Sequence, residues 1–154
     1  MSGEGLDALE RQVNRDLRVI EHPKLKWLPA RKHPTGAQIY DVLIVGAGQG
    51  LSASLARRAR AENITPLLAA RNTGKLEDLL KETQGHAHPC DTSEPASVDK
   101  LFDWAASEFG VPELVIFNAS ARARGPIAEL DPDEVRRVLE IAAYGGFLVG
   151  RAAA

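Results

Sequence analysis

The chain has 154 residues, of which 44% are hydrophobic and 26% are charged, and this composition is that of a soluble globular domain with its own core. Its net charge of −2 at pH 7 gives no reason to expect a nucleic acid or an anionic membrane as partner. The single cysteine, Cys90, cannot form an internal disulfide, and residues 1–20 lack the apolar stretch of a signal peptide. No run is long enough to span a bilayer, so we expect a cytoplasmic protein.

Residues 1–40 have a pattern unlike that of the rest of the chain. Apolar residues recur at helical spacing and predict an amphipathic helix over 6–20, at Leu6, Leu9, Val13, Leu17 and Ile20. A proline-rich strap follows over 22–36, where regular structure is excluded. Trp27 and Leu28 are candidate anchors for this strap, and a mobile N-terminal arm is the alternative that stays open.

After Tyr40, buried-strand patterns alternate with helical patterns. Strands are expected at 41–45, 67–70, 86–90 and 114–117. Helices are expected at 50–61 with Leu51, Leu55 and Ala59 inward, at 75–83 closed by Gly85, from Ser93 or Glu94 to Phe109, and from Pro132 toward Arg151. Pro66 cannot donate to a sheet, so we place it at the first residue of the second strand.

This alternation predicts an α/β fold made of βαβ units. Right-handed crossovers then favour a parallel Rossmann-type sheet with helices on both faces and strand order 3-2-1-4. We expect this sheet to be truncated after its fourth strand, over 41–154, and to follow the N-terminal helix and strap of residues 1–40.

A glycine-rich turn joins the first strand to the first helix. It reads Gly46-Ala47-Gly48-Gln49-Gly50-Leu51-Ser52. Glycines let the chain turn sharply and let a pyrophosphate approach the backbone, where the N–H groups of the helix N-terminus face the phosphates. The strand–turn–helix context therefore predicts a phosphate-binding loop.

The end of the second strand indicates which dinucleotide is bound. Folds that use NAD place an acidic residue there, for the ribose 2′-hydroxyl, whereas this chain has Ala70, Arg71 and Asn72. A guanidinium suits a 2′-phosphate, so the sequence favours NADP(H), with NAD and FAD as the weaker alternatives. A solvated surface arginine is the other interpretation of Arg71.

Residues 41–154 resemble the N-terminal half of a short-chain dehydrogenase/reductase. The family motif Gly-x-x-x-Gly-x-Gly maps onto Gly46, Gly50 and Ser52, with serine in place of the last glycine. The adenine-contacting Asp maps onto Asp91, in Cys90-Asp91-Thr92, and the Asn-Ala-Gly motif maps onto Asn118-Ala119-Ser120. Gly145-Gly146-Phe147-Leu148 resembles the start of the long helix that follows. The resemblance and the loop together imply these cofactor-binding residues: Gly46, Gly48, Gln49, Gly50, Leu51, Arg71, Asn72, Asp91, Thr92, Asn118, Ala119 and Ser120.

The family's catalytic residues have no match in this chain. Its Tyr-x-x-x-Lys pair is absent, because Ile44 and Leu148 stand four residues after Tyr40 and Tyr144, the only tyrosines. The family's helical asparagine maps onto Ala142. We therefore assign no catalytic residue and expect this chain alone to be inactive as an oxidoreductase.

A second resemblance covers residues 1–48. Arg15-Asp16-Leu17, Trp27-Leu28-Pro29 and the stretch from Asp41 to Gly48 are similar to the N-terminus of FAD-dependent, NAD(P)H-using monooxygenases. That family needs a glycine where this chain has Leu51, and a glutamate where it has Ala70 and Arg71. An FAD-binding module therefore stays as an alternative function, and a non-enzymatic α/β interaction domain as another.

Other polar residues give weaker signals. His86 and His88 lack further ligands at metal spacing, so no metal site is expected. Cys90 suits a buried apolar residue, and Arg122 and Arg124 suit a solvated loop, with a contact to phosphate or substrate as the alternative. The far edge of the fourth strand is expected to be unpaired, which predicts self-association through residues 113–117 or cover from the N-terminal helix.

Overall fold

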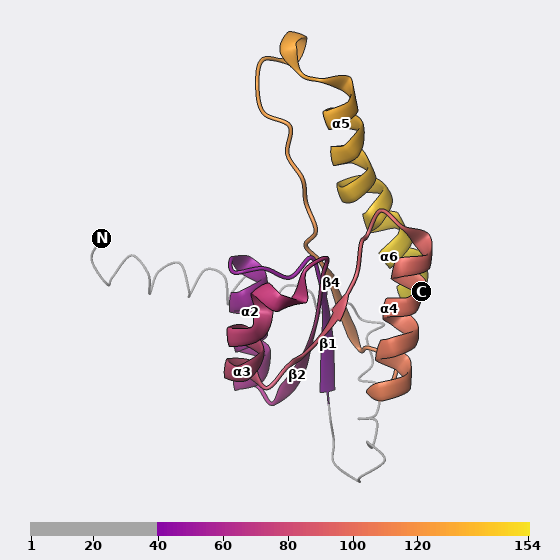
Figure 1. The fold of residues 1–154 in the computed structure, drawn as a ribbon. Helices are drawn as coiled ribbons and strands as arrows, with labels where there is room; N and C mark the ends of the chain where they lie inside the picture. Colours follow the sequence, from indigo (N-terminus) through magenta and orange to yellow (C-terminus); the bar gives the residue numbers. More distant parts are fainter. Residues whose placement is uncertain (1–39) are drawn as a thin grey trace, which may run out of the picture. The chain divides into compact units, whose positions relative to one another are not determined.

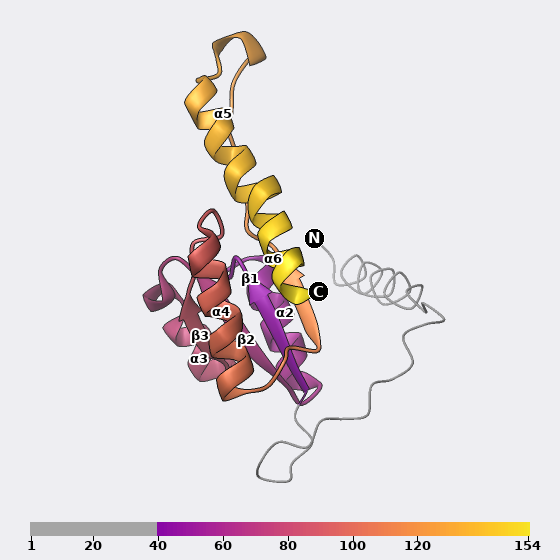
Figure 2. The same cartoon turned by 90° about the vertical axis from the view of Figure 1, so that its right-hand side faces the viewer.

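The computed structural model describes residues 40–154, so the helix predicted over 6–20 and the strap over 22–36 lie outside the described residues. Four parallel strands form one sheet in the order β3-β2-β1-β4, with helices on both faces (Figures 1 and 2). The predicted Rossmann-type sheet and its strand order are confirmed. The strands are β1 (Tyr40–Val45), β2 (Ile64–Ala70), β3 (His86–Pro89) and β4 (Leu114–Phe117).

The helical segments follow the predicted alternation, with two differences. They are α2 (Leu51–Ala61), a 3-10 turn η2 (Thr73–Leu76), α3 (Glu77–Thr83), α4 (Pro95–Glu108), a 3-10 turn η3 (Ile127–Glu129), α5 (Pro132–Leu139), a π turn η4 (Glu140–Tyr144) and α6 (Gly145–Ala153). The helix predicted over 75–83 thus begins as a 3-10 turn, and the last predicted helix contains a π turn. Within residues 40–154, the structure contains no helix that is both long and apolar enough to cross a membrane.

Strand β1 supplies side chains to two separate cores, because successive residues of a strand face opposite sides of the sheet. Leu43 and Val45 lie in the core beneath α4 and α6, whereas Val42 and Ile44 lie in the core beneath α2 and α3. Full burial of each such side chain contributes about 1.5–3 kcal/mol to folding. A continuous apolar run is therefore what this central strand requires.

Pro66 lies inside β2 rather than at its first residue, because the strand begins two residues earlier, at Ile64. The carbonyl of Ala70 accepts from Cys90 N at 3.1 Å, so even-numbered residues of β2 direct their backbone groups toward β3. The pairing with β3 begins only at Leu67 and His86. The missing N–H of Pro66 therefore falls just before the ladder starts, and no strand pairing is lost.

Two helix details differ from the sequence-based expectation. The buried face of α2 consists of small residues, Ser52, Ala53, Ala56 and Ala59, whereas Leu51 is 62% exposed. Helix α3 ends at Thr83 and its C-cap is Gln84, which has a left-handed conformation (φ 52°), whereas we expected Gly85 to close the helix. Gly85 is required for a different reason, since a Cβ there would lie 2.6 Å from the carbonyl oxygen of Pro66.

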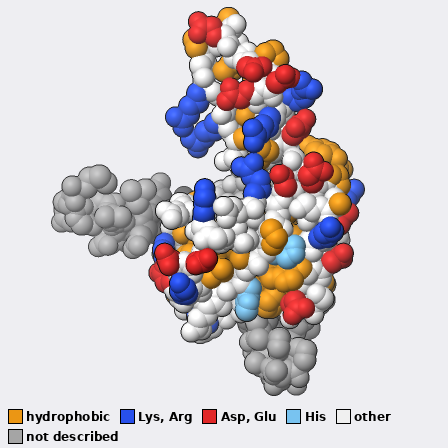
Figure 3. Space-filling view, viewed as in Figure 1, with side chains coloured by type: hydrophobic (Ala, Val, Ile, Leu, Met, Phe, Trp, Pro, Cys, Tyr) orange, Lys and Arg blue, Asp and Glu red, His pale blue; other side chains and the backbone are white. Residues whose placement is uncertain are grey.

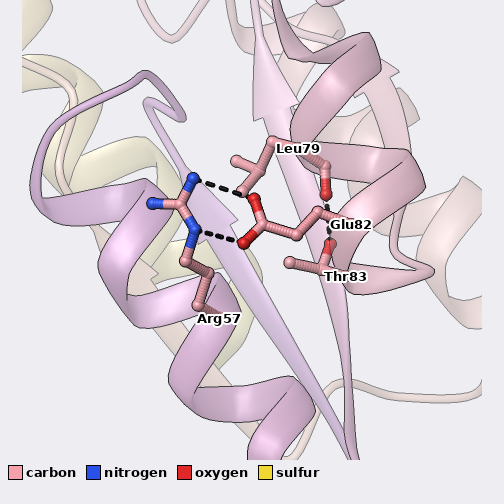
Figure 4. A network of polar contacts seen from close by, with 4 residues as sticks. All are labelled: Arg57, Leu79, Glu82 and Thr83. Carbon is pink, nitrogen blue, oxygen red and sulfur yellow. Dashed lines mark hydrogen bonds and ion pairs between the residues drawn. The ribbon is translucent and has the colours of Figure 1, made fainter.

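A bidentate ion pair joins α2 to α3 on the surface of the domain (Figure 4). Arg57 donates from Nε to Glu82 Oε1 at 2.7 Å and from Nη2 to Glu82 Oε2 at 2.9 Å. The neighbouring Thr83 is buried, and its hydroxyl donates to the carbonyl of Leu79 at 2.7 Å. The side chains of the ion pair are half exposed, so solvent screens their interaction.

The segment from α5 to α6 is buried only at its end. Leu148 and Val149 of α6 are buried in the core with residues of the sheet and α4, and Gly145 is buried beside Thr92, whereas no residue of α5 is buried. Asp131 caps α5, with its Oδ1 accepting from Asp133 N at 2.9 Å, and the helix begins at Pro132 as predicted. Figure 1 shows α5 standing beyond the strand ends, while α6 lies beside α4.

Candidate dinucleotide site

The four strands are parallel, so the residues that follow them meet at one edge of the sheet. A pocket of about 310 Å³ opens there. Seven predicted cofactor residues line it: Gly46, Arg71, Asp91, Thr92, Asn118, Ala119 and Ser120. Ligands of open α/β sheets bind at this edge. Figure 3 shows Lys and Arg side chains on both sides of the hollow above the strand ends.

A second pocket, of about 530 Å³, adjoins the first at the end of β2. It contains three more predicted residues, Gly48, Gln49 and Asn72, and it shares Arg71 with the first pocket. Gly50 lies next to this group as the N-cap residue of α2. Leu51 lines neither pocket and is mostly exposed. Ten of the twelve predicted residues therefore line the two pockets, and Gly50 and Leu51 follow them at the start of α2.

The glycine turn depends on one residue with a left-handed backbone conformation, Gly46. Gly46 has φ +87°, and both Gly46 N and Ala47 N donate to the carbonyl of Ala69, at 2.9 Å and 2.8 Å. A Cβ on Gly48 or Gly50 would meet nothing within 4 Å. Gly46 is thus needed for the turn itself, whereas Gly48 and Gly50 leave the loop backbone open to a ligand.

The acidic residue of the site is held in a turn. Asp91 Oδ1 accepts from Ser93 N at 3.0 Å and from Ser93 Oγ at 2.6 Å. These hydrogen bonds lower the pKa of the Asp91 carboxyl, and the positive charges of Arg71 and Arg137 lower it further. Asp91 is therefore ionised and oriented at neutral pH.

The residues that follow β2 combine positive charge with a turn. Asn72 Oδ1 accepts from Gly74 N at 3.1 Å and caps the 3-10 turn, so part of its hydrogen-bonding capacity is used within the chain. Arg71 and Lys75 both line the second pocket, which also contains one carboxylate, that of Asp78. This end of the site suits an anionic group.

Asn118 and Ser52 connect the end of β4 to the glycine turn. The backbone N of Asn118 donates to the Val45 carbonyl at 2.7 Å, and its Nδ2 donates to Ser52 Oγ at 2.8 Å. Ser52 is buried, and its hydroxyl donates to the Gly46 carbonyl at 3.2 Å. The serine that replaces a family glycine therefore makes contacts a glycine lacks.

Several lining residues were missed by the sequence analysis. They are Ala47, Ala70, Cys90 and Ile141 in the first pocket and Gly74, Lys75, Leu76 and Asp78 in the second. Lys75 had a usable signal, because it stands four residues after Arg71. Ile141 had none, since it reaches the pocket from the far end of the chain.

The two histidines and the cysteine that gave weaker signals in the sequence pack against other residues of the fold. His86 packs on Phe109 with ring centroids 4.6 Å apart, and His88 packs on Trp104 at 5.1 Å. Cys90 is buried, as expected of a filler, and burial raises the pKa of its thiol. Within residues 40–154, no group of three or more His, Cys, Asp or Glu side chains is placed to hold a metal ion. Arg122 and Arg124 are exposed on the loop after β4.

Comparison with solved structures shows the same fold. A short-chain dehydrogenase from Rhodopseudomonas palustris superposes with a TM-score of 0.68 at 30% identity, over 75% of this chain and 56% of the other. A variant of actinorhodin polyketide ketoreductase with NADPH superposes with a TM-score of 0.70 at 24% identity, over 74% of this chain and 46% of the other.

Comparison of sequences identifies the family. Residues 41–154 match the family model described as short chain dehydrogenase. Dehydrogenase/reductase SDR family member 7B of Bos taurus is 34% identical over 134 residues, which are 79% of this chain and 40% of that protein. The chain thus spans less than half the length of this relative. The match includes the stretch from Asp41 to Gly48, so the monooxygenase resemblance and its FAD site are not supported. The chain belongs to the short-chain dehydrogenase/reductase family.

Proposed function

We propose that this chain binds NADP(H) at the carboxyl ends of its strands, as an oxidoreductase domain of the short-chain dehydrogenase/reductase family. The observation that carries the proposal is the meeting of Gly46, Arg71 and Asp91 in one pocket at this edge. A solved structure with the same fold was obtained with NADPH, which supports the choice of ligand.

The pyrophosphate is assigned to the glycine turn and the N-terminus of α2. The backbone at Gly48 and Gly50 is open, and the first turn of α2 contains no acidic residue that would repel an anion. Helix N–H groups and the helix dipole favour phosphate there. Gln49 and Leu51 flank these groups and are assigned to the same contact.

The adenosine end is assigned to the residues that follow β2 and β3. Arg71 is the candidate partner of the 2′-phosphate, with Lys75 as a second cation and Asn72 as a hydrogen-bonding neighbour. Asp91 and Thr92 are assigned to the adenine, in keeping with the family resemblance. Because an arginine stands where NAD-binding folds place a carboxylate, we infer a preference for NADP(H) over NAD(H).

The remaining part of the cofactor is assigned to Asn118, Ala119 and Ser120. When bound, NADPH supplies a hydride to a carbonyl substrate. This chain contains no Tyr-x-x-x-Lys pair, and Ala142 stands at the position of the family's asparagine. We therefore propose that these 154 residues do not reduce a carbonyl by themselves. Absorbance at the NADPH band with a panel of ketones tests this, and turnover would contradict it.

The test of cofactor choice is Arg71→Glu. The variant replaces the cation by a carboxylate that repels a 2′-phosphate but accepts a ribose 2′-hydroxyl. We expect NADPH affinity to fall by roughly a hundredfold, the equivalent of two charge-assisted contacts, with NADH affinity changed far less. Fluorescence titrations with NADPH and NADH measure both affinities.

The matched control is Arg58→Glu, which makes the same charge change in the last turn of α2. It is expected to leave both affinities unchanged. Equal weakening of NADPH and NADH by Arg71→Glu would contradict the role of Arg71. If the wild-type chain bound neither nucleotide, the non-enzymatic interaction domain would be favoured instead.

Self-association is the second part of the proposal. Within residues 40–154, β4 is an edge strand of the sheet, and Leu114 on this strand is 53% exposed. An unpaired edge of this kind favours pairing with another chain, so we propose a homo-oligomer formed through residues 113–117.

A further inference from the structure

Ser52 is the one polar side chain of α2 that is fully buried, with 1% of its surface exposed. Its hydroxyl group is used twice, because it donates to the Gly46 carbonyl at 3.2 Å and accepts from Asn118 Nδ2 at 2.8 Å. Both partners line the candidate pocket. The serine itself does not line it, so any effect of Ser52 on a ligand passes through these two residues.

Asn118 is held from two directions. Its backbone N–H is fixed on β1 by the 2.7 Å hydrogen bond to the Val45 carbonyl, and its side-chain amide is fixed by Ser52. The amide belongs to the end of β4 and the hydroxyl belongs to α2, 66 residues away in the sequence. Without the hydroxyl, the Asn118 side chain loses the only partner that the structure gives its amide nitrogen within residues 40–154.

Gly46 is likewise held by two contacts, one with the end of β4 and one with Ser52. A Cβ on Gly46 would lie 2.2 Å from the backbone N of Ala119, so the turn and the end of β4 are in direct contact. Ser52 bonds to the carbonyl of this same glycine. The Ser52 hydroxyl therefore links the Gly46 carbonyl to the Asn118 side chain, in addition to the backbone hydrogen bond from Asn118 to Val45.

We propose that Ser52 is a positioning residue for dinucleotide binding, which acts by orienting Asn118 and the Gly46 carbonyl. The inference rests on the proposed function, and it concerns one end of the site. Strand order places Arg71, after β2, and Asn118, after β4, on opposite sides of the glycine turn after β1. Ser52 therefore affects the part of the ligand beyond the glycine turn and not the 2′-phosphate end.

The test compares two ligands of different reach. Adenosine 2′-phosphate extends only over the Arg71 end, whereas NADPH extends over the glycine turn to Asn118. We expect Ser52→Ala to weaken NADPH binding by roughly tenfold and to leave adenosine 2′-phosphate binding unchanged, as measured by calorimetric titration. Ser52→Thr keeps the hydroxyl and is expected to recover most of the affinity. Equal weakening of both ligands would indicate general loosening of the fold and would overturn the proposal.

A measurement without ligand tests the same link independently. The Asn118 side-chain amide protons are expected to exchange slowly with solvent in the wild-type chain and at least tenfold faster in Ser52→Ala, as followed by NMR. Ser54→Ala, an exposed serine of the same helix, is the control and leaves the exchange unchanged. Unchanged exchange in Ser52→Ala overturns the inference. Failure of the wild-type chain to bind NADPH would instead refute the proposed function, and the exchange result would still decide the role of Ser52.

Discussion

The backbone of Ala119 occupies the space that a side chain on Gly46 would need. A Cβ built on Gly46 lies 2.2 Å from Ala119 N and 2.4 Å from Ala119 Cα. Gly46 also has φ +87°, in the region that disfavours L side chains. The first glycine of the motif is therefore required by the fold itself, before any ligand binds.

We predict that Gly46→Ala destabilises the domain severely. The left-handed backbone alone costs about 1–2 kcal/mol for a non-glycine residue, and the clash with the Ala119 backbone adds to that cost. Urea unfolding followed by circular dichroism should show a lower midpoint or no folded baseline.

The matched control for this glycine is Gly150→Ala in α6. A Cβ there meets nothing within 4 Å, and alanine is favoured over glycine in a helix by about 1 kcal/mol. This variant should be as stable as the wild-type chain or more so. A Gly46→Ala variant with wild-type stability would mean that the turn and β4 separate easily.

The Asp91 turn makes stability depend on pH. Hydrogen bonds from Ser93 lower the pKa of this carboxyl in the folded chain, so Asp91 stabilises the fold above its unfolded pKa, near 4. That contribution is lost as the pH falls through the lowered folded value. The free energy of unfolding should fall more between pH 7 and pH 3 for the wild-type chain than for Asp91→Asn, because the amide does not titrate.

Substitution of Ser93 tests how much of the lowered Asp91 pKa is due to the Ser93 hydroxyl. Ser93→Ala removes the 2.6 Å hydrogen bond from Ser93 Oγ, and the pKa of Asp91 should rise toward its ordinary value. NMR titration of the Asp91 carboxyl carbon measures the change. Ser107→Ala, on the exposed side of α4, should leave the Asp91 titration as it is. An Asp91 pKa that is insensitive to Ser93→Ala would assign the shift to the backbone N–H of Ser93, which alanine keeps, and to the charges of Arg71 and Arg137.

The bidentate pair between Arg57 and Glu82 is predicted to have a small, salt-dependent effect. Both side chains are half exposed, so water and ions screen their attraction. A double-mutant cycle with Arg57→Ala and Glu82→Ala should give a weak coupling at low salt that disappears at roughly 1 M salt, where the Debye length is about 3 Å. A coupling that survives high salt would indicate that α2 and α3 exclude water from the pair.

The edge of β4 offers a test of self-association that spares the fold. Asn118 N donates to the Val45 carbonyl, so even-numbered residues of this segment direct their N–H groups to β1, while Val115 directs its N–H outward. Val115→Pro should therefore lower self-association in light scattering while the sheet remains folded.

The neighbouring substitution is the control for this edge. Ile116→Pro removes an inward N–H and should unfold the domain. A wild-type chain that is monomeric at all concentrations would contradict pairing through β4.

The pattern of apolar residues was sufficient to predict the buried central strand of the sheet. The run from Val42 to Val45 is apolar at every position, and only a strand covered on both faces buries every one of its side chains. The Asp131 cap and the proline after it likewise determined where α5 begins. Features of this kind can be predicted from the sequence, because each residue acts on the backbone next to it.

Details that depend on distant neighbours were not predicted. Leu51 looked like a core residue, but α2 approaches the sheet through Ala53, Ala56 and Ala59, and Leu51 stays exposed. Gly85 looked like a helix terminator, but close packing on Pro66 is what requires it. Helical spacing shows that one face is apolar, but it does not show how closely the helix approaches its neighbour.

The sequence by itself determined the strand order, the glycine turn and the group of polar residues after each strand, because parallel strands bring their carboxyl ends to one edge. Only the tertiary structure decided that Ser52 joins Gly46 to Asn118 and that Ile141 lines the pocket. These contacts link segments far apart in the chain, and their distances depend on how the helices pack on the sheet.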